Sequence, residues 1–220
     1  MSSDSSNASD PEAYDRLAST GRAEHTAEGS RFIAFAWPVD SEAHAESLVQ
    51  GLRDQYHDAR HVCYGLRVGH GAQRIDRSND DGEPPRTGGF PLWQLLEGQD
   101  LEDSMIAVVR YFGGTKLGMG GLRRAYREAG RLALHDAGVI THHPTFALQL
   151  IIDYDRYDEV CHRLEQVQAC SIVDRDFAAQ ITLNLRIWRS QFATVIRQIA
   201  SWLQVSPQSL VDDPDILDGS

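Results

Sequence analysis

The sequence predicts an α+β protein built from two domains. A chain of 220 residues is long enough for one large domain or two small ones, and its expected helices and strands fall into two groups. A linker-like stretch, Thr-His-His-Pro-Thr at residues 141–145, separates the two groups. In the second group the order strand, helix, strand, strand, helix is the split-βαβ pattern of ferredoxin-like domains.

The first domain is expected at residues 21–141, after a tail at residues 1–20 whose Ser, Asp and Asn content is typical of disorder. Pro38 ends the first strand, and apolar residues at helical spacing mark the two longer helices. A turn-rich segment at residues 78–89 follows, and loops of this length are often functional. The expected elements are a strand at 31–37, a helix at 41–56, strands at 62–68 and 72–77, a helix at 90–96, a strand at 105–112 and a helix at 121–137.

The second domain is expected at residues 145–206, and an Asp-rich tail at residues 207–220 closes the chain. A short extended segment near Val205 would complete the ferredoxin-like pattern with a last strand. The other expected elements are a strand at 146–152, a helix at 154–166, strands at 170–176 and 179–187 and a helix at 189–202.

Composition narrows the class of protein. The chain has no run of about 18 apolar residues for a membrane span, and its N-terminus lacks the charged-then-apolar pattern of an export signal. Its three cysteines, Cys63, Cys161 and Cys170, have no CxxC spacing, which argues against a disulfide framework or a zinc knuckle. We therefore expect a cytoplasmic protein with no membrane partner, no metal and no cofactor; its oligomeric state is left open.

Positive charge is concentrated around the densest glycine cluster. The formal net charge of the chain is -11, yet residues 105–131 carry a local charge of +5. Lys116, the only lysine beside twenty arginines, lies in the cluster Arg-Tyr-Phe-Gly-Gly-Thr-Lys-Leu-Gly-Met-Gly-Gly at residues 110–121. A basic patch on an acidic chain suits an anionic partner. Adaptation to high salt would also produce an acidic surface in which arginine replaces lysine.

This glycine-rich segment joins a strand to a helix, where free backbone N–H groups and the helix dipole favour an anion. Its spacing matches neither a P-loop nor GxGxxG, so the competing interpretation is a tight turn with close helix packing. The arginines of the helix recur at four-residue steps and share one face, which is either a solvated surface or a track for phosphates. The predicted anion- or nucleic-acid-binding residues are Arg110, Gly113, Gly114, Lys116, Gly118, Gly120, Gly121, Arg123, Arg124, Arg127 and Arg131.

A second group of polar residues suggests an enzyme as the alternative. His61 and Cys63 alternate on an expected strand and therefore point to the same side. With Asp80, Asp81 and Glu83 from the turn-rich segment they could form a thiol, imidazole and carboxylate cleft or a metal site. The competing interpretation of Cys63 is a small buried apolar residue.

Four segments carry a resemblance to a known family. They are Gly-Ser-Arg-Phe-Ile at 29–33, His-Val-Cys-Tyr at 61–64, Asp-Asp-Gly-Glu-Pro at 80–84 and, above all, Val-Arg-Tyr-Phe-Gly-Gly-Thr-Lys-Leu-Gly-Met-Gly-Gly-Leu at 109–122 with Arg-Ala-Tyr at 124–126. Together they resemble the IMPACT family in its bacterial YigZ form, over residues 20–140, with a second domain similar to that of YigZ proteins. The family commonly has glycine-threonine before its last glycine-leucine pair; this chain has Met119 there.

The resemblance implies a first domain like the second domain of ribosomal protein S5, an α/β sandwich, and a ferredoxin-like second domain like domain V of elongation factor G. Eukaryotic members restrain a translation-initiation kinase by competing for its activator protein, and for bacterial members RNA or ribosome association is an analogy from these folds. We therefore expect a non-enzymatic, translation-associated regulator that binds RNA, the ribosome or a translation factor. The alternatives are an enzyme or phosphate or nucleotide binder that uses the glycine-rich segment with the polar cleft, and a protein-interaction module.

Overall fold

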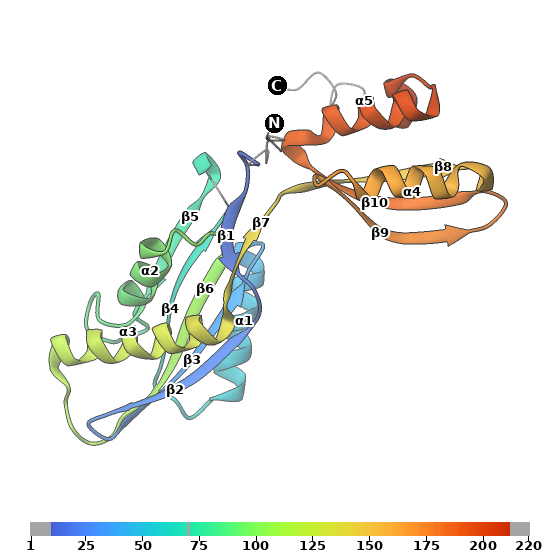
Figure 1. The fold of residues 1–220 in the computed structure, drawn as a ribbon. Helices are drawn as coiled ribbons and strands as arrows, with labels where there is room; N and C mark the ends of the chain where they lie inside the picture. Colours follow the sequence, from blue (N-terminus) through green and yellow to red (C-terminus); the bar gives the residue numbers. More distant parts are fainter. Residues whose placement is uncertain (1–9, 70, 212–220) are drawn as a thin grey trace, which may run out of the picture. The chain divides into compact units, whose positions relative to one another are not determined.

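The computed structural model describes residues 10–69 and 71–211 (Figure 1). Contacts within the chain divide it into two compact units. The N-terminal unit is Tyr14–His142, and the C-terminal unit is His143–Ser220 together with Met1–Ala13. Both units combine helices with antiparallel strands, so the expected two-domain α+β class is confirmed. No helix of the described residues is long and apolar enough to cross a membrane.

The N-terminal unit is built around a five-stranded antiparallel sheet of order β2-β3-β6-β4-β5. Helices α2 and α3 pack on one face of this sheet, and α1 packs on the other (Figure 1). Alternate residues of the central strands feed the two cores, since Phe32 contributes to the first and Ile33 to the second. The elements are β2 (Gly21–Ala27), β3 (Ser30–Pro38), α1 (Glu42–Gln55), β4 (His61–Val68), β5 (Ile75–Asn79), α2 (Gly89–Gly98), β6 (Ser104–Tyr111) and α3 (Gly118–Ala137).

Two strands at the ends of this unit correct the expected organisation. Strand β1 (Tyr14–Leu17) pairs with β7 (Val139–His142), although residues 1–20 were expected to be a disordered tail. Leu17 is fully buried in the core shared with α2 and α3, which fixes the strand in place. A local pattern could not show this, because the partner strand lies more than a hundred residues further along the chain. Residues 1–9 of the expected tail lie outside the described residues.

Several other boundaries differ from the expected ones. Strand β2 was not predicted, and α3 begins at Gly118 instead of residue 121. The strand expected at 72–77 is β5 at 75–79, preceded by a short 3-10 turn at Gly71–Gln73. The stretch expected as a linker at 141–145 is mostly strand, because β7 ends at His142 and β8 begins at Thr145.

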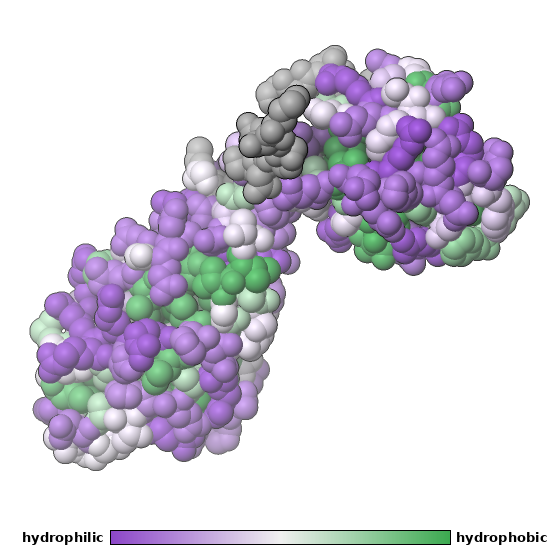
Figure 2. Space-filling model, viewed as in Figure 1, coloured by the Kyte–Doolittle hydropathy of each residue, from purple (hydrophilic) through white to green (hydrophobic). Residues whose placement is uncertain are grey.

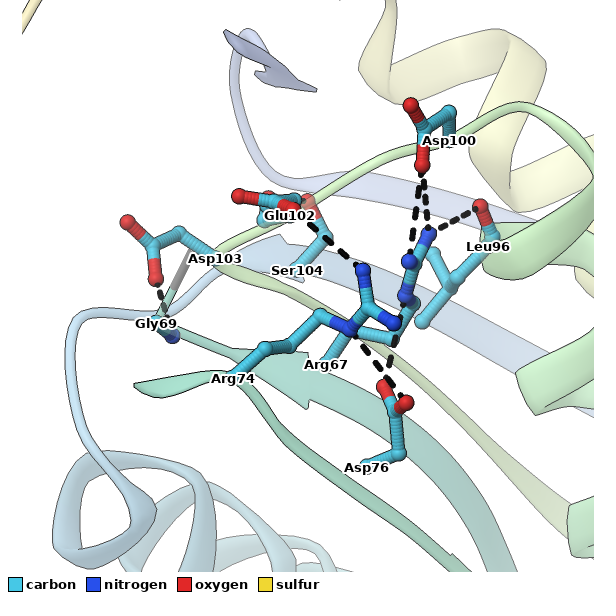
Figure 3. Close-up of polar contacts among 9 residues, drawn as sticks. All are labelled: Arg67, Gly69, Arg74, Asp76, Leu96, Asp100, Glu102, Asp103 and Ser104. Atoms are coloured by element: carbon cyan, nitrogen blue, oxygen red, sulfur yellow. Dashed lines mark hydrogen bonds and ion pairs between the residues drawn. The ribbon is translucent and has the colours of Figure 1, made fainter. Parts of the chain in front are cut away.

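A network of ion pairs fastens one end of the sheet. Arg67, whose side chain is only 3% exposed, pairs with Asp76 at 3.3 Å and Asp100 at 3.4 Å. Arg74 pairs with Asp76 at 3.3 Å and with Glu102 at 3.5 Å. Figure 3 shows these groups converging from β4, β5 and the segment after α2. The network therefore joins the β4–β5 hairpin to the segment that leads into β6.

The C-terminal unit has a three-stranded antiparallel sheet of order β8-β10-β9, with two helices packed on one face (Figure 1). Every second residue of β10 is buried against the helices, as expected for a sheet with one covered face. The last strand expected near Val205 is not formed, because α5 continues to Leu203 and a 3-10 turn, Pro207–Leu210, follows. Asp212 and the residues after it lie outside the described residues. The elements are β8 (Thr145–Ile152), α4 (Tyr157–Glu165), β9 (Cys170–Phe177), β10 (Ile181–Trp188) and α5 (Phe192–Leu203).

Asp10 ties the N-terminal segment to the C-terminal unit. Its carboxylate accepts a hydrogen bond from the Ser190 hydroxyl at 2.6 Å and lies 2.8 Å from Nδ1 of His143. The His143 ring in turn stacks on Trp188, with 4.0 Å between ring centroids. Burial opposes ionisation of this carboxyl, but hydrogen bonds from Ser190, His143 and the Glu12 N–H outweigh it and hold the pKa of Asp10 below its ordinary value.

Candidate anion-binding groove

Helices α2 and α3 enclose a groove of about 320 Å³ that is lined by four arginines. No carboxylate is among the residues that line it. Helical spacing places Arg123 and Arg127 on the exposed face of α3, while Tyr126 and Ala129 on the opposite face are fully buried. In Figure 2 the surface over α3 is mostly hydrophilic. The lining residues are Arg86, Phe90, Pro91, Gln94, Arg123, Arg124 and Arg127.

Arg86 comes from the turn-rich segment and is held at the groove by its backbone. Its N–H donates to the Asp80 carboxylate at 2.7 Å, and its carbonyl accepts from Nε of Arg123 at 3.1 Å. The same carboxylate accepts from the N–H groups of Gly88 and Gly89, at 2.8 and 2.9 Å, so Asp80 organises the whole turn. Sequence reasoning missed Arg86, although its place after a Pro-Pro pair in the long loop was a usable signal.

The guanidinium group of Arg86 stacks on an aromatic ring. Its central carbon lies 3.6 Å from the centroid of Phe90, the second residue of α2. Cation–π contacts of this kind are stabilising and leave the charge in place. The groove therefore combines a planar stacked pair on one wall with the arginines of α3 on the other.

Lys116 lines a second, wider groove at the start of α3. This groove has a volume of about 780 Å³ and contains Arg124, which borders both grooves, but also Glu28 and Glu128. Its charges are therefore mixed, whereas the groove between α2 and α3 has only positive ones. Lys116 is exposed, and its anion-binding role stays a prediction.

Arg131 does not line the arginine groove. Its guanidinium pairs with Glu128, one turn earlier on α3, at 2.7 Å. Hydrogen bonding within this pair lowers the pKa of Glu128 and raises that of Arg131. The last arginine of the expected row therefore has a carboxylate partner of its own.

Arg110 is likewise not available at the surface, which corrects its expected place in the binding face. Its side chain is 7% exposed and pairs with the buried Glu83 at 2.6 Å. The same Glu83 oxygen accepts from the Tyr126 hydroxyl at 2.8 Å, and Ser30 contacts the guanidinium at 3.4 Å. This network joins β6, α3, the turn-rich segment and β3 inside the unit.

The glycines of the glycine-rich segment at residues 110–121 have different roles. A Cβ on Gly113 would lie 1.9 Å from the carbonyl carbon of Gly29, so that glycine permits close approach of two backbones. Gly114 and Gly118 have φ of 91° and 68° in open space, where the backbone conformation itself favours glycine. Gly120 and Gly121 lie in the first turn of α3 instead of a loop. The glycine-rich segment, which was expected to bind an anion through its backbone N–H groups, therefore serves in part to allow close packing and a tight turn.

The structure does not arrange the predicted polar residues as an open cleft. Cys63 is fully buried, with its sulfur 3.0 Å from the Asp80 carbonyl, and burial raises the pKa of its thiol well above the ordinary value. The Asp81 carboxylate binds Arg53 at 2.7 Å and accepts the Val62 N–H. These groups have structural partners, so they do not form a thiolate nucleophile with its base.

His61 contacts the same turn through its ring. Its Nδ1 lies 2.7 Å from the carbonyl oxygen of Asp81. Glu83, which was also expected in the cleft, pairs with Arg110. Among the described residues, no three His, Cys, Asp or Glu side chains are grouped so that they could hold a metal ion.

Comparisons with known proteins agree with the sequence motifs. The model of the Impact N-terminal domain matches residues 28–134. IMPACT family member YvyE of Bacillus subtilis (strain 168) is 33% identical over 156 residues, 71% of each chain. IMPACT family member YigZ of Escherichia coli (strain K12) is 30% identical over 183 residues, 82% of this chain and 89% of YigZ. A crystal structure of a hypothetical protein, 27% identical, has a TM-score of 0.62 and covers 88% of this chain and 94% of its own.

The fold and groove define a two-domain α+β protein with a basic groove on an acidic chain. The chain belongs to the IMPACT family, which confirms the resemblance inferred from its motifs.

Proposed function

We propose that this IMPACT-family protein is a translation-associated regulator that binds RNA at the groove between α2 and α3. The observation that carries the proposal is the lining of that groove, which has four arginines and no carboxylate although the whole chain has a net charge of -11. Guanidinium groups bind phosphate oxygens through pairs of hydrogen bonds. The groove is therefore suited to a polyanion.

The acidic remainder of the chain confines that binding to one place. Acidic residues elsewhere repel phosphates, so RNA would be held at the groove and not over the whole surface. Lys116 and Arg124, in the adjoining groove, could contact a neighbouring phosphate of the same strand. The link to translation rests on the family relation, through the eukaryotic role stated above.

The test is fluorescence anisotropy with a labelled RNA over a salt series, comparing wild type with the variant Lys116→Ala/Arg123→Ala/Arg127→Ala. We expect the variant to bind about 10–100-fold more weakly, with a smaller salt dependence, since each phosphate contact contributes roughly 0.7 to the slope for single strands. A matched control, Arg22→Ala/Arg131→Ala/Arg163→Ala, removes three arginines that each have a carboxylate partner. It should bind nearly as the wild type does.

Four outcomes would count against the proposal. Wild type could fail to bind RNA, or both triple variants could lose equal affinity, which would indicate a general charge effect. A partner captured from lysate after ribonuclease treatment, and lost in the groove variant, would indicate a protein ligand. Thermal stabilisation by mononucleotides without RNA binding would favour the small-anion alternative, since a ligand at 100 times its dissociation constant adds about 2.7 kcal/mol.

A further inference from the structure

We infer that the groove between α2 and α3 binds single-stranded RNA, with one base stacked on the Arg86–Phe90 pair and the adjacent phosphate held by Arg123 and Arg127. This inference rests on the proposed function and specifies its ligand. Grooves that take single strands combine positive charge along the backbone with planar groups on which bases stack. The described groove has both features within one set of lining residues.

The stacked pair supplies the platform. The central carbon of the Arg86 guanidinium lies over the Phe90 ring, 3.6 Å from the ring centroid. Arg86 is exposed and borders the groove. RNA-binding proteins stack unpaired bases on aromatic rings and on the planes of arginine guanidinium groups. A base that enters the groove would therefore extend an existing stack.

The charge of Arg86 is free for a ligand. The three acids of its loop are occupied internally. Asp80 accepts three backbone N–H groups, Asp81 pairs with Arg53, and Glu83 binds Arg110 and Tyr126. No ion pair with a carboxylate is found for Arg86 within the described part of the chain. The electrostatic attraction of this side chain is therefore directed into the groove.

The backbone at Arg86 is held in one defined conformation, which sets the direction of its side chain. Its φ is 60°, a left-handed conformation that glycine adopts without strain and a long side chain does not. The conformation is fixed by the Arg86 N–H bond to Asp80 and by Nε of Arg123, which donates to its carbonyl.

The size of the groove favours a single strand over a duplex. A volume of about 320 Å³ is at the lower end of small-molecule pockets, and so suits a group of nucleotide size. The bases of an A-form duplex are paired and stacked inside the helix, and proteins contact its shape and sugar edges instead. Only an unpaired base can reach the Arg86–Phe90 platform.

The experiment compares three labelled probes of equal length by anisotropy: a single-stranded RNA, the same RNA as a duplex, and an abasic strand that keeps the phosphates. We expect the single strand to bind about 10-fold more tightly than the other two, in line with one stacked base. Arg86→Lys keeps the charge but removes the planar group, so it should lose this factor on the single strand and none on the abasic strand.

Arg127→Ala should weaken all three probes and reduce the salt slope by roughly 0.7 on the single strand. Arg131→Ala, the control on the same helix, should change none of them, and unchanged urea midpoints would show that the variants fold. Equal affinity for the three probes, or an Arg86→Lys variant that binds as wild type does, would overturn this inference. The proposed function would still stand in either case if RNA binding depends on Arg127. No binding of any probe would overturn both.

Discussion

Substitution within the buried pair of Glu83 and Arg110 should strongly destabilise the N-terminal unit. The two side chains are 4% and 7% exposed, and their charged atoms lie 2.6 Å apart. The change Glu83→Ala leaves the Arg110 charge buried without its carboxylate and removes the acceptor of the Tyr126 hydroxyl. Both groups were desolvated on folding, so each loses a partner that water cannot replace.

The expected loss of unfolding free energy follows from this geometry. Removing one partner of a buried ion pair costs about 3–5 kcal/mol, because the remaining charge is uncompensated. For a unit of this size that corresponds to a fall in melting temperature of roughly 10–20 °C. The matched control is Glu128→Ala, which removes a carboxylate from a pair that is 51% and 40% exposed and should cost less than about 1 kcal/mol.

The measurement is urea unfolding followed by tryptophan fluorescence. In a Trp188→Phe/Trp202→Phe background the signal comes from Trp37 and Trp93, which both lie in the N-terminal unit. This separates its transition from that of the C-terminal unit. The midpoint and slope of the transition then give the loss of unfolding free energy.

A loss below about 1 kcal/mol for Glu83→Ala would refute the reasoning, since it would mean that the pair contributes no more than an exposed one. The double variant Glu83→Met/Arg110→Met provides a second check. It removes both charges together and fills the space with apolar atoms, so it should be clearly more stable than Glu83→Ala. Equal instability of the two would show that packing, and not the uncompensated charge, is responsible.

Gly113→Ala should destabilise the N-terminal unit by about 1–3 kcal/mol, because the added Cβ would clash with the backbone of Gly29. Gly51→Ala should instead raise the melting temperature of the unit, since a Cβ there meets no atom within 4 Å. Equal melting temperatures for the two variants would contradict this prediction. Cys63 should react with a thiol reagent far more slowly than Cys170, because Cys63 is fully buried and its pKa is raised further than that of Cys170, which is raised to about 11. Mass spectrometry that shows Cys63 modified first would count against this prediction. Because the pKa of Asp10 is lowered in the folded state, its carboxylate adds stability above the unfolded pKa that is lost as pH falls through the folded one. Asp10→Asn should therefore be less stable by about 1–3 kcal/mol at pH 7, with the difference vanishing at low pH in urea melts; a constant difference would exclude this linkage.

Most elements with strong local patterns were predicted. Strand β6 is an apolar run buried on both faces, and the apolar stripe of α3 is continuous, so both are recognisable without a partner. Strand β2 has a weaker pattern, because α3 packs so closely over Gly21 that a Cβ there would meet a helix carbonyl at 2.2 Å. Three of its inward positions, Gly21, Ala23 and Ala27, hold small residues, which carry little hydrophobic signal.

The candidate site could be predicted only in part. The concentration of arginines on α3 and the importance of the 78–89 segment were both visible in the sequence. Which arginines face a ligand was not, because that depends on carboxylates brought close by folding. Arg110 was included, although Glu83 neutralises it in the interior, and Arg86 was overlooked, although the turn at Asp80 places it on the groove.

The sequence by itself determined the family, the two-domain α+β organisation and the placement of positive charge, since each is encoded in motifs or periodicities that are read locally. The tertiary structure decided which of those charges are paired with carboxylates inside the protein and which remain available to a ligand. The reason is physical: an ion pair or a buried thiol depends on distances between segments far apart in the chain, and only the packed sheet and helices set those distances.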